Sequence, residues 1–238
     1  MTTAATMSAK AAESELHARG SAADAAVLSG FFKTGPGEYG EGDIFLGVRV
    51  PAVREVARRY ARLPLRSVVA LLKSPYHECR LLALLILVLQ CESGSEDDQR
   101  RRVETYLTHT KWINNWDLVD LSAYHILGAW LRWRDRGLLY VLADSTSLWE
   151  RRIAIVATYQ FIRHDDFADT LAVAGQLLHD RHDLIHKAVG WMLREVGKRD
   201  QAVEEQFLKK HARAMPRTML RYAIERFPEP LRQSYLAR

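Results

Sequence analysis

The feature of this sequence that most constrains its fold is a basic residue that recurs about every 35 positions. Arg152, Lys187 and Arg221 are separated by 35 and 34 residues. Arg80 precedes Arg152 by 72 residues, or two periods of 36, and the intermediate position is occupied by Trp116. The basic residues lie early in four similar stretches: HECRLLALL (77–85), WERRIAIVA (149–157), LIHKAVGWM (184–192) and MLRYAIERF (219–227). Such a period is typical of stacked pairs of helices.

The apolar residues follow a helical period nearly everywhere, and we find no convincing alternating strand. The TPR signature is absent, so we expect an all-α, HEAT-like helical-repeat solenoid with a concave basic surface. The 13 Gly and seven Pro residues fall mostly at junctions between the expected helices. These helices cover residues 8–19, 22–33, 51–61, 65–73, 76–91, 96–109, 115–133, 136–143, 148–163, 166–179, 183–197, 200–213, 216–227 and 229–236.

The chain is expected to form one repeat domain over residues 1–238, with residues 1–20 as a flexible or loosely packed N-terminal segment. The long irregular stretch is TGPGEYGEGDIFLGV, residues 34–48. We interpret it as an ordered loop, because Ile44, Phe45 and Leu46 would need burial.

Composition narrows the class of protein and of partner. The chain has 34 Lys and Arg residues against 29 Asp and Glu, a formal charge of +5, which favours a polyanionic partner.

Cys79 and Cys91 are 12 residues apart on one expected helix, so their separation of about 18 Å is too long for a disulfide. The segment MTTAATMSAKAAESELHARG lacks the apolar centre of a signal peptide. The nine-residue run LLALLILVL (81–89) is too short to span a bilayer and should form a buried core helix. We therefore expect a cytoplasmic protein, nucleoid-associated through DNA, with no membrane partner.

The segment TKWINNWDLVD (110–120) contains the most distinctive candidate site. Trp116 and Asp120 are four residues apart, so they share one helical face. Applying the same four-residue step to Lys187 gives Trp191, so the repeat predicts that Trp116, Asp120, Arg152 and Trp191 converge on one wall. A basic groove with aromatic faces is typical of a nucleic-acid binder. Two indoles beside a carboxylate suit cleavage of the N-glycosidic bond to a cationic alkylated base, since the carboxylate stabilises the positive charge that develops on the sugar.

Four stretches resemble the AlkD-type alkylpurine DNA glycosylases, the HEAT-like DNA alkylation repair family. They are IFLGVRVPAVRE (44–55), WDLVD (116–120), LWERRIAI (148–155) and IHKAVGWMLRE (185–195). The similarity extends from about residue 25 to residue 230, with the pieces in the family's order.

The resemblance implies a metal-independent and cofactor-independent enzyme of base excision repair that releases 3-methyladenine and 7-methylguanine from duplex DNA. The lesion need not be flipped into a pocket, unlike in most enzymes that act on bases. By this resemblance Asp120 is the catalytic carboxylate, Trp116 and Trp191 face the lesion, and Arg152 contacts the backbone. Further DNA contacts are expected from Lys187, Arg80, Arg221, Arg49 and Arg194. The sequence departs from the family at Asn115, where some relatives carry Trp, and at Arg49, where Gln is expected.

Several other residues are interpreted as structural. Asp117 is interpreted as a structural charge at a helix N-terminus. Trp112 is expected to be a buried residue at a helix end. The remaining tryptophans outside the site are expected to pack between helices or at their ends: Trp130, Trp133 and Trp149. The HDLIH segment (182–186) is close to the HExxH zinc signature, but its second residue is Asp and no further ligand follows, so no metal is expected.

The main alternative function is a HEAT-repeat module that binds damaged or structured DNA without chemistry, and a protein-interaction solenoid is a third. The chain is expected to act as a monomer.

Overall fold

The structure is a computed structural model that describes residues 7–237. Within this range the chain is helical, and its β-structure is limited to an isolated bridge between Ile44 and Tyr76. The prediction of an all-α fold is therefore confirmed. The chain divides into two compact units, with the boundary between Ser122 and Ala123. The prediction of a single repeat domain over residues 1–238 stays a prediction.

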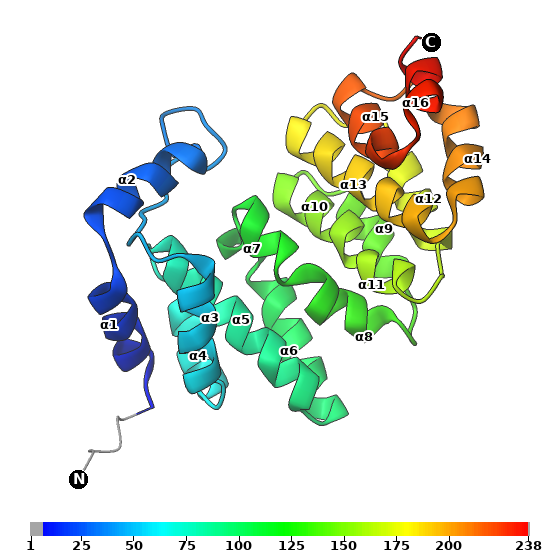
Figure 1. Cartoon of the computed structure of the whole chain (residues 1–238). Coiled ribbons are helices and arrows are strands. Elements are labelled where there is room, and N and C mark those ends of the chain that lie inside the picture. Colours follow the sequence, from blue (N-terminus) through cyan, green and yellow to red (C-terminus); the bar gives the residue numbers. More distant parts are fainter. Residues whose placement is uncertain (1–6, 238) are drawn as a thin grey trace. The chain divides into compact units, whose positions relative to one another are not determined.

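Unit 1 contains α1 (Ala9–Arg19), α2 (Ala22–Phe31), α3 (Val50–Arg59), α4 (Leu65–Leu72), α5 (His77–Ser93), α6 (Glu96–Thr108), the short helix Thr110–Trp112 and α7 (Trp116–Asp120). Its centre is α5, which packs against α3, α4 and α6 (Figure 1). The run Leu81–Val88 on α5 is buried, as expected for a core helix. Cys79 and Cys91 also lie on α5, and both are reduced and buried.

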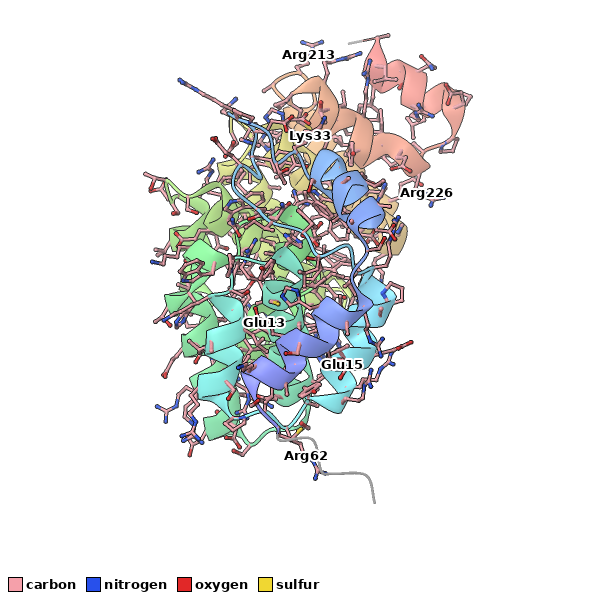
Figure 2. The ribbon with its side chains drawn as sticks, turned by 90° about the vertical axis from the view of Figure 1, so that its left-hand side faces the viewer. Glu13, Glu15, Lys33, Arg62, Arg213 and Arg226 are labelled. Carbon is pink, nitrogen blue, oxygen red and sulfur yellow. The ribbon has the colours of Figure 1, made fainter. Side chains whose placement is uncertain are left out.

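The N-terminal helix α1 is better packed than the sequence suggested. Ser8 caps it by accepting a hydrogen bond from the Ala11 N–H, and Ala12 and Leu16 are fully buried. Figure 2 shows Glu13 and Glu15 on this helix, and Glu15 pairs with Arg59 of α3. The expectation of a loosely packed segment is therefore wrong for α1, while residues 1–6 lie outside the described residues.

The loop between α2 and α3 is ordered, as predicted, but its apolar residues are not all buried. Phe45 is buried, Leu46 is half-buried, and Ile44 is 49% exposed. Gly47 has φ +83°, and a Cβ there would collide with the Ser21 carbonyl at the start of α2. Glycine is therefore required at this position for two reasons: the backbone has a positive φ, and α2 approaches too closely for a Cβ.

Unit 2 contains the π-helical turn Tyr124–Gly128, α8 (Ala129–Leu131), α9 (Gly137–Ala143), α10 (Leu148–Ala157), α11 (Tyr159–Ile162), α12 (Ala168–Gln176), α13 (Asp183–Arg199), α14 (Gln201–His211), α15 (Arg217–Ala223), the 3₁₀ turn Ile224–Arg226 and α16 (Glu229–Leu236). α13 packs against both α10 and α15 (Figure 1). Gly190 permits the second approach, because a Cβ there would collide with the Met219 carbonyl.

The repeat inferred from sequence is preserved in unit 2. Arg152, Lys187 and Arg221 occupy the same position, the fifth residue, of α10, α13 and α15. Their spacing of 35 and 34 residues therefore corresponds to three successive packed helices. Within residues 7–237, no helix is both long enough and apolar enough to cross a bilayer.

Candidate functional site

The short helix α7 presents Trp116 and Asp120 to a cavity of about 400 Å³ in unit 1. Asn115 caps this helix, and its side-chain oxygen accepts a hydrogen bond from the Trp116 N–H at 2.8 Å. The walls of the cavity are mostly apolar: Leu28, Phe31, Phe32, Phe45, Val48, Val50, Pro51, Leu81 and Leu121. The predicted sharing of one face by Trp116 and Asp120 is thus confirmed, and an indole and a carboxylate line the same apolar space.

Trp116 is braced by other aromatic rings. Phe32 stacks on it with centroids 5.0 Å apart and an interplanar angle of 22°, and Phe31 meets it edge-on at 5.8 Å. Phe32 also stacks on Phe45 at 5.1 Å, and Phe45 stacks on His77 at 4.4 Å. A continuous set of rings therefore joins the indole to the first residue of α5, which restricts how far the indole can rotate.

A buried ionic network lies beneath these rings. His77 contacts Asp43 through Nδ1 at 3.0 Å and Asp117 through Nε2 at 2.9 Å. Arg80 pairs with the second oxygen of Asp43 at 2.6 Å. Asn114 donates a further hydrogen bond to Asp43 at 3.1 Å. The network contains two carboxylates, an imidazole and a guanidinium, and it ties the loop, α5 and the start of α7 together.

The network favours the charged forms of His77 and Asp43. Burial lowers the pKa of His77, but the charge of Asp117 and the hydrogen bonds with Asp117 and Asp43 raise it more, to about 9. Burial raises the pKa of Asp43, but the hydrogen bond from His77 and the charge of Arg80 lower it more, so that it ends below its ordinary value. His77 is therefore an imidazolium at neutral pH and donates from both ring nitrogens.

Two expectations change in the light of this network. Asp117 is structural, as predicted, but through the buried contact with His77 as well as through its hydrogen bond from the Leu118 N–H. Arg80 was expected as a DNA contact on the concave basic surface, but the structure buries it instead. Its side chain is 4% exposed, and it donates to the carbonyls of Ser74 and Pro75 as well as to Asp43.

Two other contacts hold the loop over the cavity. The buried carboxylate of Glu78 accepts hydrogen bonds from the N–H groups of Leu46, Gly47 and Val48, at 2.9, 2.9 and 3.1 Å. Arg49, which also lines the cavity, pairs with Asp24 of α2 at 2.5 Å, and its side chain is 59% exposed. Arg49 therefore remains at the surface, where a phosphate contact was expected.

The second predicted indole, Trp191, lies in unit 2 on α13. Its Nε1 donates to Glu195 at 3.1 Å, and its ring lies 6.1 Å from that of Tyr159. Glu195 is buried and is also held by Lys198 at 2.7 and 2.9 Å. The indole is half-buried.

The basic residues of unit 2 differ in exposure. Arg152 is buried and donates to the Leu184 carbonyl. Lys187 is 38% exposed and pairs with Asp183 at 2.7 Å. Arg221 is exposed, whereas Arg194 is largely buried and pairs with Glu225.

The zinc-like HDLIH segment forms the start of α13. His182 caps that helix by accepting from the Leu184 N–H at 3.1 Å, and His186 contacts the Asp180 carbonyl at 2.5 Å. Among residues 7–237, no group of three or more His, Cys, Asp and Glu side chains is arranged to hold a metal ion.

The structure thus brings together part of the predicted site in each unit. Trp116 and Asp120 share a cavity in unit 1, and Trp191 belongs to unit 2. Their convergence on one wall stays a prediction. No pattern in the sequence indicated the ionic role of His77. The FF pair at 31–32 was a usable signal for the aromatic support, because it ends an expected helix beside an apolar loop.

The comparisons with known proteins agree with the family resemblance that was stated from the sequence. The model of a family described as DNA alkylation repair enzyme matches residues 12–227. A similar solved structure is described as a predicted DNA alkylation repair enzyme from Enterococcus faecalis. It superposes with a TM-score of 0.70 at 16% identity, covering 89% of this chain and 98% of that one. At this identity the likeness shows the fold, and it confirms the predicted fold class. A comparison with curated proteins gave no match.

Proposed function

The chain belongs to the family of DNA alkylation repair enzymes, and on that premise we propose that it is a monofunctional DNA glycosylase. Its substrates would be duplex DNA containing cationic alkylated purines such as 3-methyladenine and 7-methylguanine. The products would be the free base and an abasic site, the first step of base excision repair. The proposed reaction uses neither a metal nor an organic cofactor, and the enzyme acts as a monomer.

The observation that carries this proposal is the cavity shared by Trp116 and Asp120. An indole face attracts a cation with about 0.5–2 kcal/mol, depending on desolvation. A carboxylate in apolar surroundings stabilises positive charge that develops on the sugar, and it can orient a water molecule. The alkylated base already carries a positive charge and leaves as a neutral molecule, so the step requires no general acid.

DNA binding is assigned to the exposed cations. Arg49, Lys187 and Arg221 are accessible to phosphates, although Arg49 and Lys187 would have to exchange their carboxylate partners for them. Each phosphate neutralised would contribute about −0.9 to the slope of log affinity against log salt. Arg80 is omitted because of its burial. Arg152 is also buried, and it is retained only because the family resemblance implies a contact to the backbone beside the lesion. Arg194 is kept as a further proposed DNA contact, for which it would have to exchange Glu225 for a phosphate.

The test measures release of 7-methylguanine from methylated duplex DNA, with EDTA present and DNA affinity measured in parallel. Asp120→Asn is compared with the wild type and with Asp144→Asn, which removes an exposed carboxylate at the end of α9. We expect Asp120→Asn to reduce the rate by about 10²-fold or more while binding DNA. Asp144→Asn should resemble the wild type.

Two results would contradict the proposal in different ways. A wild type that binds methylated DNA without releasing base would leave the non-catalytic DNA-binding module as the function. An active Asp120→Asn variant would keep the glycosylase but remove Asp120 from its chemistry. Because no lysine is assigned as a nucleophile, strand cleavage is not expected in either case.

A further inference from the structure

Trp191 is held at its nitrogen by a residue that the proposed chemistry has not used. Glu195 lies one helical turn after Trp191 on α13, and its Oε1 accepts the indole N–H at 3.1 Å. Residues four apart on a helix share one face, so the pair requires no distortion of the backbone. The N–H of a half-buried indole would otherwise need water or another acceptor.

Glu195 is itself held in place. Lys198 binds both of its oxygens, at 2.7 and 2.9 Å, and the Arg194 Nε lies 3.9 Å from Oε1. Arg194 is in turn paired with Glu225. The Glu195 side chain is only 10% exposed. A carboxylate with this burial and these cationic neighbours loses several contacts if it rotates away from the indole.

The indole also has a ring neighbour. Tyr159 lies 6.1 Å from Trp191 at an interplanar angle of 36°, and Tyr124 meets Tyr159 edge-on at 5.2 Å. Tyr159, Glu195 and Lys198 line a polar hollow of about 530 Å³ on this side of unit 2. Trp191 is therefore oriented by a carboxylate at its nitrogen and by an aromatic ring beside it.

We propose that Glu195 is a positioning residue for Trp191, which fixes the orientation of the indole and increases its attraction for the positive charge that passes from the base to the sugar as the glycosidic bond breaks. An anionic acceptor at the N–H polarises the indole and makes its π face more negative, which is the face that binds a cation. The inference rests on the proposed glycosylase function, in which Trp191 contacts the alkylated nucleotide.

The experiment is a double-mutant cycle on release of 7-methylguanine. Glu195→Ala and Glu195→Gln are made in the wild type and in Trp191→Phe, which lacks the indole N–H. Glu225→Gln is the matched control, because it removes a carboxylate that pairs with Arg194 without contacting Trp191. Thermal unfolding of each variant monitors the fold, and ¹H–¹⁵N spectra report the indole N–H of Trp191, assigned as the signal missing in Trp191→Phe.

We expect Glu195→Ala to slow base release about tenfold, which corresponds to about 1.4 kcal/mol in activation free energy. Glu195→Gln should slow base release less than Glu195→Ala does, because its amide oxygen can still accept the indole N–H. In Trp191→Phe, either change should alter the rate less than about twofold, since there is no N–H to hold. The Trp191 indole signal should move upfield in Glu195→Ala and stay in place in Glu225→Gln.

Three results would overturn the inference. Equal losses from Glu195→Ala in both backgrounds would show a role in folding alone. An unchanged indole signal would show that the hydrogen bond is not formed, whatever the rate of base release. Equal losses of rate from Glu195→Ala and Glu225→Gln would assign the effect to general surface charge. A wild type that releases no base refutes the proposed function itself, and the role of Glu195 in the reaction fails with it.

Discussion

Raising the pH from 6 to 10 should remove about 3 kcal/mol of stability from unit 1 through His77. The pKa of His77 is raised from 6.5 to about 9 in the folded chain, and its side chain is 2% exposed between Asp43 and Asp117. The folded state therefore binds the proton more tightly than the unfolded state. This stability is fully present below pH 6.5 and is lost as the pH rises through about 9.

The assay compares the wild type with His77→Gln, which does not titrate. The free energy of unfolding is measured by urea denaturation, followed by circular dichroism at 222 nm, at several pH values from 6 to 10. Other groups that titrate, including the buried Glu204, are present in both proteins, so they cancel in the difference. The difference between the two proteins should shrink by about 3 kcal/mol across this range.

A difference that stays constant with pH would refute the argument. It would mean that His77 is neutral in the folded chain and that the network holds it by hydrogen bonds alone. Asp117→Asn provides an independent check, because it removes the charge that does most to raise the pKa of His77. In that variant the histidine should titrate nearer its ordinary pKa, as measured from its imidazole nitrogen resonances.

Further predictions concern a buried acid and a glycine. Burial raises the pKa of Glu204 from 4.5 to about 8, so the wild type should lose about 4 kcal/mol of stability between pH 5 and pH 9 that Glu204→Gln retains. Urea denaturation at both pH values measures this, and parallel pH profiles would contradict it. Gly47→Ala should cost at least about 2 kcal/mol more than Gly42→Ala, because both have a positive φ but only Gly47 has no space for a Cβ. Equal shifts in thermal midpoint for the two variants would show that backbone conformation alone decides the cost.

The sequence was sufficient for the helical order and for the register of the repeat. Apolar periodicity and proline positions placed most helices within a few residues, since both reflect local sequence. It was less reliable where tertiary contacts decide. The expected helix 115–133 is divided into α7, a π-helical turn and α8. Trp133, expected to pack between helices or at their ends, is 77% exposed.

In the candidate site too, features set by local sequence could be predicted, and features set by tertiary contacts could not. The four-residue spacing of Trp116 and Asp120 was enough to place them together, because it depends on one helix. The burial of Arg80 could not be inferred, because its partner Asp43 lies 37 residues away in an irregular loop. A basic residue in a repeat can hold neighbouring backbone as well as face a ligand, and periodicity alone does not distinguish the two roles.

Each proposed lesion-facing indole is held in place by its own unit. Trp116 stacks on Phe32, which in turn lies against the ring of His77, and Trp191 is held by Glu195. Both supports are formed by side chains of the chain itself, so we expect little reordering of either ring when a lesion binds. Pre-oriented groups favour the transition state because their reorganisation does not add to the barrier. Loosening either support should therefore lower kcat more than it weakens binding of methylated DNA, whereas loss of an exposed cation such as Lys187 should do the reverse.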